Sequence, residues 1–216
     1  MIEELSPGLD ATDDPAFIAA WYDRFGASYL AHSAFREEFV QARLENLAAL
    51  LPSNATFLDL GCGAGIPVMR WLADHYHAAP VNPKLAAAIT GVDISEGQIA
   101  LAEAFVPEAN LIRGDMLEVS FPLAYFDAVV SLYALPHIPT GRCSELLTRA
   151  AEWTKPGGLF LVNWTVFELA PAAGGEQGGV EEEFIMLLRA SGWRVENVWD
   201  ENEGDDAWTW ALAIRE

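Results

Sequence analysis

The sequence predicts an α/β protein: a three-layer sandwich in which helices cover both faces of a seven-stranded, mostly parallel sheet with an antiparallel last strand. Three observations predict it. Short apolar runs alternate with amphipathic stretches along most of the chain. A glycine-rich turn at 61–65 joins the first expected strand to the helix that follows. The last apolar run, 208–214, alternates as a half-buried antiparallel strand does.

Composition predicts one folded domain over residues 1–216. Hydrophobic residues make up 52% of the chain and eight residues are Trp, so disorder is excluded. The formal net charge of −20 argues against a nucleic-acid partner, because phosphate binding depends on basic contacts. No apolar run approaches the roughly 18 residues of a membrane span. We therefore expect no membrane partner. Two cysteines are too few for a disulfide framework, so we expect a cytoplasmic protein. Its oligomeric state stays open.

This domain is expected to have three parts. Residues 1–14 are acidic and are expected to be frayed, residues 15–52 form cover helices, and residues 56–215 form the core. Asp14 is predicted to cap the first cover helix, with Pro15 at its first helical position.

Gly26 is predicted to interrupt this first helix, and a second one is expected from Ser33 to Pro52. The core elements should then follow in alternation. Strands are expected at 56–60, 86–93, 110–113, 126–133, up to 166, 194–200 and 208–214; helices are expected at 66–77, 95–105, around 146–150 and at 181–190. Residues 170–179 are expected to form a mobile loop that orders when substrate binds.

The glycine turn is the first candidate binding site. Its spacing lacks the third glycine of a dinucleotide fingerprint, and no lysine follows as in a phosphate loop. Asp59 lies two residues before the first glycine. A carboxylate there would repel a pyrophosphate but would suit a cationic amino group. A nucleotide-dependent oxidoreductase is therefore disfavoured.

With these residues the chain resembles class I S-adenosylmethionine-dependent methyltransferases, whose first motif reads hh(D/E)hGxGxG. The motif positions are filled by Asp59, Gly61, Gly63 and Gly65. Later stretches match the family in order: Asp93 after the second strand, 114–116 (Gly-Asp-Met) after the third, and 155–158 (Lys-Pro-Gly-Gly) as a turn before the fifth. The resemblance implies a Rossmann-like fold, S-adenosyl-L-methionine as cofactor and S-adenosyl-L-homocysteine as its product.

The resemblance also implies roles for single residues. Asp93 would bind the ribose hydroxyls, Asp115 the adenine amine, and Met116 would pack on the ring. Their simpler roles would be a helix cap for Asp93 and a solvated turn for Asp115; the order of the motifs favours ligand binding. In similar enzymes, tyrosines at the positions of Tyr22 and Tyr29 approach the cofactor or substrate. The alternative is that these two side chains pack as amphipathic residues. The full predicted cofactor set is Asp59, Gly61, Cys62, Gly63, Gly65, Asp93, Ile94, Asp115, Met116, Ser131, Tyr22 and Tyr29.

Catalytic candidates follow the fourth strand. His137 is the candidate base, with a structural role as the alternative, and Tyr133 is a second pocket candidate. Ser131 stands where metal-dependent relatives need an acid, so no metal is predicted. We therefore expect O-, N- or C-methylation of a small molecule. The alternative is a regulatory module that binds S-adenosylmethionine, or a non-methylating enzyme on the same fold.

Overall fold

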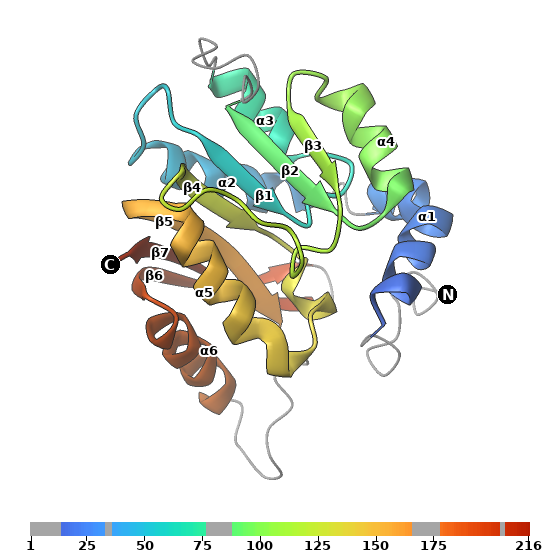
Figure 1. The fold of residues 1–216 in the computed structure, drawn as a ribbon. Helices are drawn as coiled ribbons and strands as arrows, with labels where there is room; N and C mark the ends of the chain where they lie inside the picture. The colour runs from blue at the N-terminus through green and yellow to red at the C-terminus, as the bar shows by residue number, and fades with distance from the viewer. Residues whose placement is uncertain (1–13, 33–35, 77–87, 166–177, 204–205) are drawn as a thin grey trace. The chain divides into compact units, whose positions relative to one another are not determined.

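The computed structural model describes residues 14–32, 36–76, 88–165, 178–203 and 206–216 (Figure 1). Its seven strands form one sheet in the order β3-β2-β1-β4-β5-β7-β6, which confirms the predicted fold. The chain divides into two compact units, the N-terminal unit (residues 1–120) and the C-terminal unit (residues 121–216). The prediction of a single domain stays a prediction.

The described residues of the N-terminal unit form three parallel strands and four helices. Their bounds are α1 (Pro15–His32), α2 (Glu37–Ala48), β1 (Phe57–Leu60), α3 (Val68–His75), β2 (Ile89–Asp93), α4 (Glu96–Phe105) and β3 (Asn110–Arg113). Strand β1 is buried along its whole length, as expected of a strand covered on both faces. Helix α4 packs on β2 and β3, and α1 lies along α4.

Helix α1 begins at Pro15, and Asp14 Oδ1 accepts a hydrogen bond from the backbone nitrogen of Ala16 (2.9 Å), which confirms the predicted start. The predicted interruption at Gly26 is wrong, because α1 continues to His32. A Cβ atom at Gly26 would lie 2.2 Å from Nε2 of Gln98. The glycine therefore permits close approach of α1 to α4 and does not end the helix.

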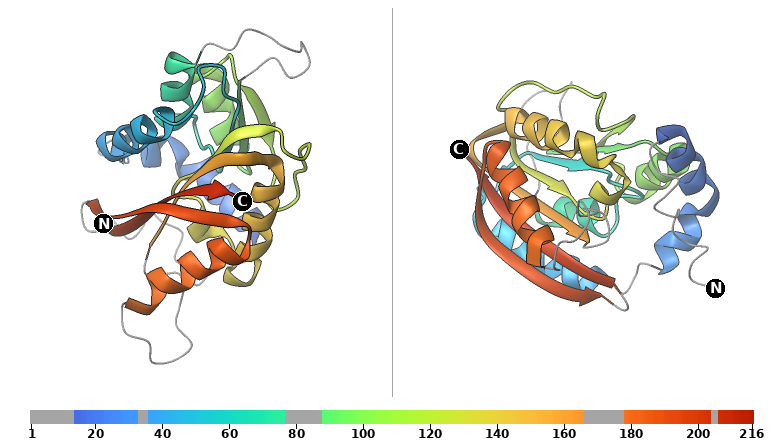
Figure 2. Two further views of the ribbon diagram at one scale, coloured as in Figure 1. Left: turned by 90° about the vertical axis from the view of Figure 1, so that its left-hand side faces the viewer. Right: turned by 90° about the horizontal axis from the view of Figure 1, so that it is seen from below.

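The C-terminal unit is built on a long antiparallel hairpin. Its elements are β4 (Phe126–Ser131), the short 3₁₀ turns η3 (Leu135–His137) and η4 (Thr140–Arg142), α5 (Cys143–Trp153), β5 (Thr154–Thr165), α6 (Gly178–Ala190), β6 (Trp193–Glu203) and β7 (Asp206–Arg215). Strand β7 is antiparallel to both of its neighbours, β5 and β6, as predicted. Helix α6 packs on β6 (Figure 2). Among the described helices, none is long and apolar enough to cross a membrane.

The predicted turn at 155–158 is instead part of β5. Phe126 pairs with Thr154, but Ala128 pairs with Leu159, so one residue of β4 faces four of β5. The Lys-Pro-Gly-Gly segment is thus a bulge within the strand, with Gly157 at φ +77°.

Two helix boundaries also differ from expectation. Helix α2 ends at Ala48, ahead of Pro52, and α6 begins at Gly178, three residues before the expected start. Most of the predicted mobile loop, 170–177, lies outside the described residues, as do residues 1–13.

Candidate functional site

The three glycines of the turn all have left-handed backbone. Gly61, Gly63 and Gly65 have φ values of +78°, +52° and +76°, a region that residues with a Cβ rarely adopt. Gly65 is also crowded, since an added Cβ would lie 3.0 Å from the Val106 side chain. The turn therefore needs glycine for conformation and, at Gly65, for packing against the end of α4.

Asp59 lies in the buried strand β1, just before this turn. Its side chain is buried, and among the described residues nothing donates a hydrogen bond to Oδ2. Burial and the nearby charge of Asp93 raise the pKa of Asp59 to about 8. A buried carboxyl oxygen without a donor fits a ligand that brings a positively charged amino group. We call residues 59–65 together with Asp93 the glycine corner.

Asp93 ends β2 and holds the corner together. Its Oδ2 accepts from the backbone nitrogen of Gly63 (2.8 Å), and its Oδ1 accepts from that of Ser95 (2.9 Å). Burial raises the pKa of Asp93, and these two hydrogen bonds act in the opposite direction. The N-cap of α4 is Ser95, whose Oγ accepts from the backbone nitrogen of Gln98. Asp93 is therefore not the helix cap.

Asp23 docks α1 onto the start of α4. Its Oδ1 accepts from Ser95 Oγ (2.6 Å) and from the backbone nitrogen of Gly97 (2.9 Å). The hydrogen bond from Ser95, followed by that from Gly97, lowers the pKa of Asp23. The cover helix is thus fixed to the segment that follows Asp93. Sequence reasoning did not single out Asp23.

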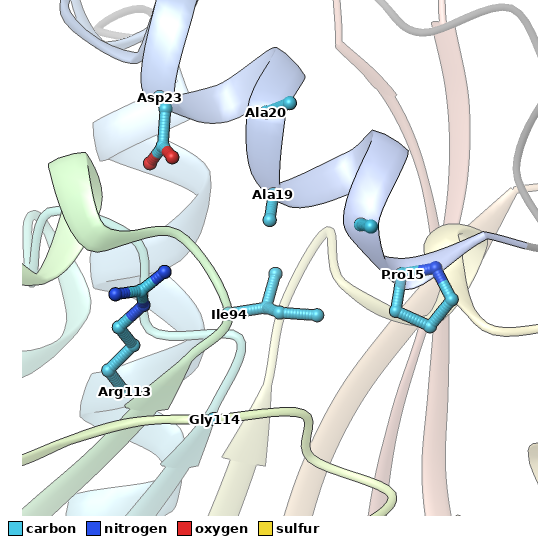
Figure 3. A pocket seen from close by; sticks show the side chains of 8 residues that line it. Pro15, Ala19, Ala20, Asp23, Ile94, Arg113 and Gly114 are labelled. Carbon is cyan, nitrogen blue, oxygen red and sulfur yellow. The ribbon is translucent and has the colours of Figure 1, made fainter.

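A cavity of about 450 Å³ lies beneath α1 (Figure 3). It is lined by Pro15, Ala16, Ala19, Ala20, Asp23, Ile94, Arg113 and Gly114. Small side chains of α1 form one wall, and Ile94, a predicted cofactor residue, lies across from them. Gly114 comes from the segment after β3, where Asp115 and Met116 follow. The cavity therefore lies at the carboxyl ends of β2 and β3, where ligands of open α/β sheets bind.

The other predicted residues of this unit vary in their surroundings. Asp115 is half-buried, and its Oδ1 accepts from the backbone nitrogen of Leu117 (2.8 Å) within a turn; its role in ligand binding stays a prediction. Met116 is half-buried. Cys62 is buried, and burial raises the pKa of its thiol. Tyr22 is half-buried with its ring against Trp21, and the side chain of Tyr29 lies outside the described residues.

In the C-terminal unit, Ser131 ends β4 and is buried, and Tyr133 follows in an unusual conformation. Tyr133 has φ +58°, a strained value for a bulky aromatic residue. Its backbone nitrogen donates to Oδ1 of Asn163 (2.6 Å), and its hydroxyl donates to Oε2 of Glu203 (2.8 Å).

Glu203 lies at the end of β6 and is fully buried. Its second oxygen, Oε1, accepts from Nε1 of Trp210 (3.1 Å). The Tyr133 ring packs edge-on against Trp208 and Trp210, with centroids 4.7 and 5.8 Å apart. We call Tyr133, Asn163, Glu203, Trp208 and Trp210 the aromatic–carboxylate cluster. Glu203 escaped sequence reasoning because it lies in an acidic stretch that looks like a solvated turn; only the β6–β7 pairing brings it inward.

His137 closes the turn η3, and its backbone nitrogen donates to the carbonyl oxygen of Ala134. Burial lowers the pKa of His137 to about 4, so its imidazole is neutral at neutral pH. Within the described part of the chain, no three His, Cys, Asp or Glu side chains are placed to hold a metal ion.

The comparison with protein families matches residues 57–158 to a model described as "Methyltransferase domain". The 27-O-demethylrifamycin SV methyltransferase of Amycolatopsis mediterranei is 29% identical over 187 residues, which cover 82% of this chain and 63% of that relative. The ubiquinone biosynthesis O-methyltransferase of Rhodopseudomonas palustris is 30% identical over 188 residues, which cover 76% of this chain and 69% of that relative. The chain thus spans about two thirds of the length of these curated relatives.

Among solved structures, the chain is similar to magnesium protoporphyrin IX methyltransferase from Synechocystis PCC 6803 with bound SAM. The TM-score is 0.70, and the match covers 94% of this chain and 98% of that one. At 16% sequence identity, this likeness concerns the fold.

Proposed function

This chain belongs to the class I S-adenosylmethionine-dependent methyltransferase family, and from that premise we propose that it transfers a methyl group from S-adenosyl-L-methionine to a small-molecule acceptor. The transfer is an in-line displacement without a metal ion, and S-adenosyl-L-homocysteine is the second product. When bound, the cofactor supplies a methyl carbon already activated by a sulfonium. The protein's part is to bind, align and exclude water.

The observation that carries this proposal is the unsatisfied Oδ2 of Asp59. A buried carboxyl oxygen without a donor is unfavourable unless a ligand completes it. The α-amino group of an amino acid would supply both the hydrogen bond and the positive charge. The neighbouring carboxylate of Asp93 makes the corner repel phosphates, which supports an amino-acid-bearing cofactor over a nucleotide phosphate.

The remaining binding residues follow from the same corner. Asp93 accepts hydrogen bonds from the ribose hydroxyls. The hydrogen bonds that it accepts from the backbone nitrogens of Gly63 and Ser95 keep its carboxylate oriented. Ile94 and Met116 pack on the adenine, and Asp115 accepts from its amine. Asp23 keeps α1 in place beside the cavity.

The acceptor is a small molecule, and a hydroxyl compound is favoured. The two relatives carry names that specify O-methylation, one of a rifamycin and one in ubiquinone biosynthesis. These two names support an oxygen nucleophile, whereas the name of the sterol 24-C-methyltransferase of Gibberella zeae, 26% identical over 182 residues, specifies carbon. A protonated oxygen acceptor needs a group that takes its proton during the transfer. The methyl group needs no further activation, because the sulfonium already activates it.

Incubation with S-adenosyl-L-methionine carrying a labelled methyl group tests the proposal. The acceptors are a panel of phenols, aliphatic alcohols and amines, and S-adenosyl-L-homocysteine is quantified by mass spectrometry. We expect label in a small molecule and an equal amount of S-adenosyl-L-homocysteine. Calorimetric binding of the cofactor with no label in any acceptor would favour the alternative, a binding module or a non-methylating enzyme. Absence of cofactor binding would contradict both.

A further inference from the structure

We propose that Tyr133 and Glu203 form a proton relay for a hydroxyl acceptor. The acceptor hydroxyl gives its proton to Tyr133 Oη, and Tyr133 gives its own hydroxyl proton to Glu203 Oε2. This inference rests on the proposed function and adds to it a catalytic tyrosine and a positioned, buried glutamate.

Glu203 is held as a proton acceptor. Tyr133 Oη donates to Oε2 at 2.8 Å and Trp210 Nε1 donates to Oε1 at 3.1 Å, so both carboxyl oxygens act as acceptors. This is the hydrogen-bonding pattern of an ionised carboxylate. The Trp208 and Trp210 rings border Tyr133, which places the contact in apolar surroundings where charge interactions are strong.

Tyr133 is the more exposed member of the pair. Its side chain is half-buried, whereas Glu203 is fully buried. The proposed path therefore runs through the tyrosine hydroxyl, which already donates to Glu203. The relay needs no movement of the glutamate, because the second hydrogen bond of the path is already formed.

The backbone at Tyr133 is strained in a way that sets its position. A φ of +58° is unfavourable for tyrosine and persists only where the surroundings determine it. Here the backbone nitrogen is fixed by Asn163 Oδ1 at 2.6 Å, and the hydroxyl by Glu203. Tyr133 is therefore a strained residue whose backbone nitrogen and side-chain hydroxyl are both fixed by hydrogen bonds.

Two further observations point to a polar ligand at this place. Asn163 is fully buried, and its Nδ2 has no hydrogen-bond partner among the described residues, so a polar atom of a ligand would satisfy it. Tyr133 follows the carboxyl end of β4, the edge at which ligands bind in open α/β sheets.

The step balances in atoms and charge. The acceptor oxygen forms a bond to the methyl carbon, and the carbon–sulfur bond of the donor breaks with its electron pair going to sulfur. The acceptor proton goes to Tyr133 Oη as the tyrosine proton goes to Glu203. One positive charge on sulfur and one negative charge on Glu203 are lost together. Glu203 later returns its proton to Tyr133 Oη as the tyrosine gives one to water, which restores the starting state.

The first test compares Tyr133→Phe and Glu203→Gln with two controls of the same chemistry, Tyr125→Phe and Glu152→Gln. The assay uses the phenol that the wild-type protein methylates best. We expect kcat to fall about 100-fold in the relay variants and to stay within about twofold in the controls. KM for S-adenosyl-L-methionine should be unchanged. Label that appears only on amines or carbon acceptors would overturn the relay.

A second acceptor separates proton transfer from a structural role. With 4-nitrophenol at alkaline pH, where the acceptor is already ionised, we expect the loss in Tyr133→Phe and Glu203→Gln to shrink to within about fivefold, because no proton remains to be taken. A loss of equal size with both acceptors would show that the two residues act only on packing, and the relay would be wrong.

A spectroscopic readout does not depend on turnover. The chain has five tyrosines, so tyrosine labelled with ¹³C at Cζ gives a simple spectrum in which Tyr133→Phe identifies the Tyr133 signal. With S-adenosyl-L-homocysteine present, adding phenol should shift that signal in wild type, and Tyr125→Phe should respond as wild type does. A Tyr133 signal that ignores phenol overturns the relay, even if no acceptor is ever methylated. A shifted signal without any methylation would instead count against the proposed function.

Discussion

Asp59 in the glycine corner and Glu203 in the aromatic–carboxylate cluster are both buried acidic side chains, with exposed fractions of 2% and 0%. Glu203 receives hydrogen bonds on both carboxyl oxygens, from Tyr133 and Trp210. Asp59 has an oxygen without a donor among the described residues, and a second carboxylate, Asp93, lies nearby. In the C-terminal unit the protein thus donates hydrogen bonds to both oxygens of the buried carboxyl group, whereas in the N-terminal unit one carboxyl oxygen receives none from the described residues.

This difference has a physical meaning. An acid whose oxygens are both satisfied is stabilised as an anion by the protein itself, so it can take a proton without rearrangement. An acid buried with an oxygen that lacks a donor resists ionisation until a cation arrives. The first arrangement suits a group that accepts a proton during catalysis, and the second suits a group that binds a cationic ligand. Replacing the two residues should therefore change stability in opposite directions.

The largest expected effect is the pH dependence caused by Asp59. Its pKa is raised from 3.8 to about 8, so between these values the folded state binds more protons than the unfolded state. The free energy of unfolding should then fall as pH rises, by up to about 1.4 kcal/mol per pH unit, until about pH 8. Asp59→Asn should abolish this slope and be more stable than wild type at pH 8.

Urea unfolding of the cofactor-free protein between pH 5 and pH 8 measures this slope. Glu103→Gln, an exposed substitution on α4, serves as the control and should keep the wild-type slope. Parallel curves for wild type and Asp59→Asn would mean that Asp59 is not protonated in the folded state, and the comparison with Glu203 would fail.

Glu203 should show the opposite sign. Glu203→Leu leaves the Tyr133 hydroxyl and Trp210 Nε1 without their acceptor, which should lower the free energy of unfolding by about 2–4 kcal/mol. Glu203→Gln keeps one carbonyl oxygen and should lose less. Denaturant titration at pH 7 measures both variants. A Leu variant as stable as wild type would show that these hydrogen bonds contribute nothing.

Asp93→Ala should weaken the binding of S-adenosyl-L-homocysteine at least about tenfold, or about 1.4 kcal/mol, while the protein remains folded. The alanine removes both the predicted ribose ligand and the acceptor for the backbone nitrogens of Gly63 and Ser95. Asp93→Asn keeps an acceptor oxygen and should fall between alanine and wild type. Isothermal calorimetry, with circular dichroism as the check of folding, gives the answer. Unchanged affinity in the alanine variant would remove Asp93 from the binding site.

The smallest effect is expected at the attachment of α1. Asp23→Ala removes the acceptor for Ser95 Oγ and the Gly97 nitrogen, which should lower stability by about 1 kcal/mol or less, as loss of a helix cap does. Hydrogen exchange should increase in α1 and at the start of α4, and less so in Asp23→Asn. Exchange that rises equally along the whole N-terminal unit would indicate general destabilisation and not release of the cover helix.

The sequence predicted those parts of the fold that depend on local signals. Strand β3 and helix α4 lie where the apolar runs and Ser95 placed them, because short runs and caps act over a few residues. Gly26 was misjudged because a glycine inside a helix can mark either a break or a close approach. Only the position of Gln98, 72 residues later, decides between them.

The candidate site divides in the same way. The glycine corner could be predicted because its residues follow one another in a short motif around a turn. The aromatic–carboxylate cluster could not, since Glu203 reaches Tyr133 across 70 residues, through the pairing of β6 with β7 and of β7 with β5. No local sequence pattern predicts that Tyr133 adopts a left-handed backbone conformation.

That backbone bears on how this position tolerates replacement. Glycine, and to a lesser degree asparagine, would relieve the strain at φ +58°, but either would remove the ring that packs on Trp208 and Trp210 and the hydroxyl that donates to Glu203. A large ring persists there at the expense of an easier conformation. Replacing Tyr133 by glycine should therefore lower the free energy of unfolding, because the lost ring packing and hydrogen bond outweigh the relieved strain.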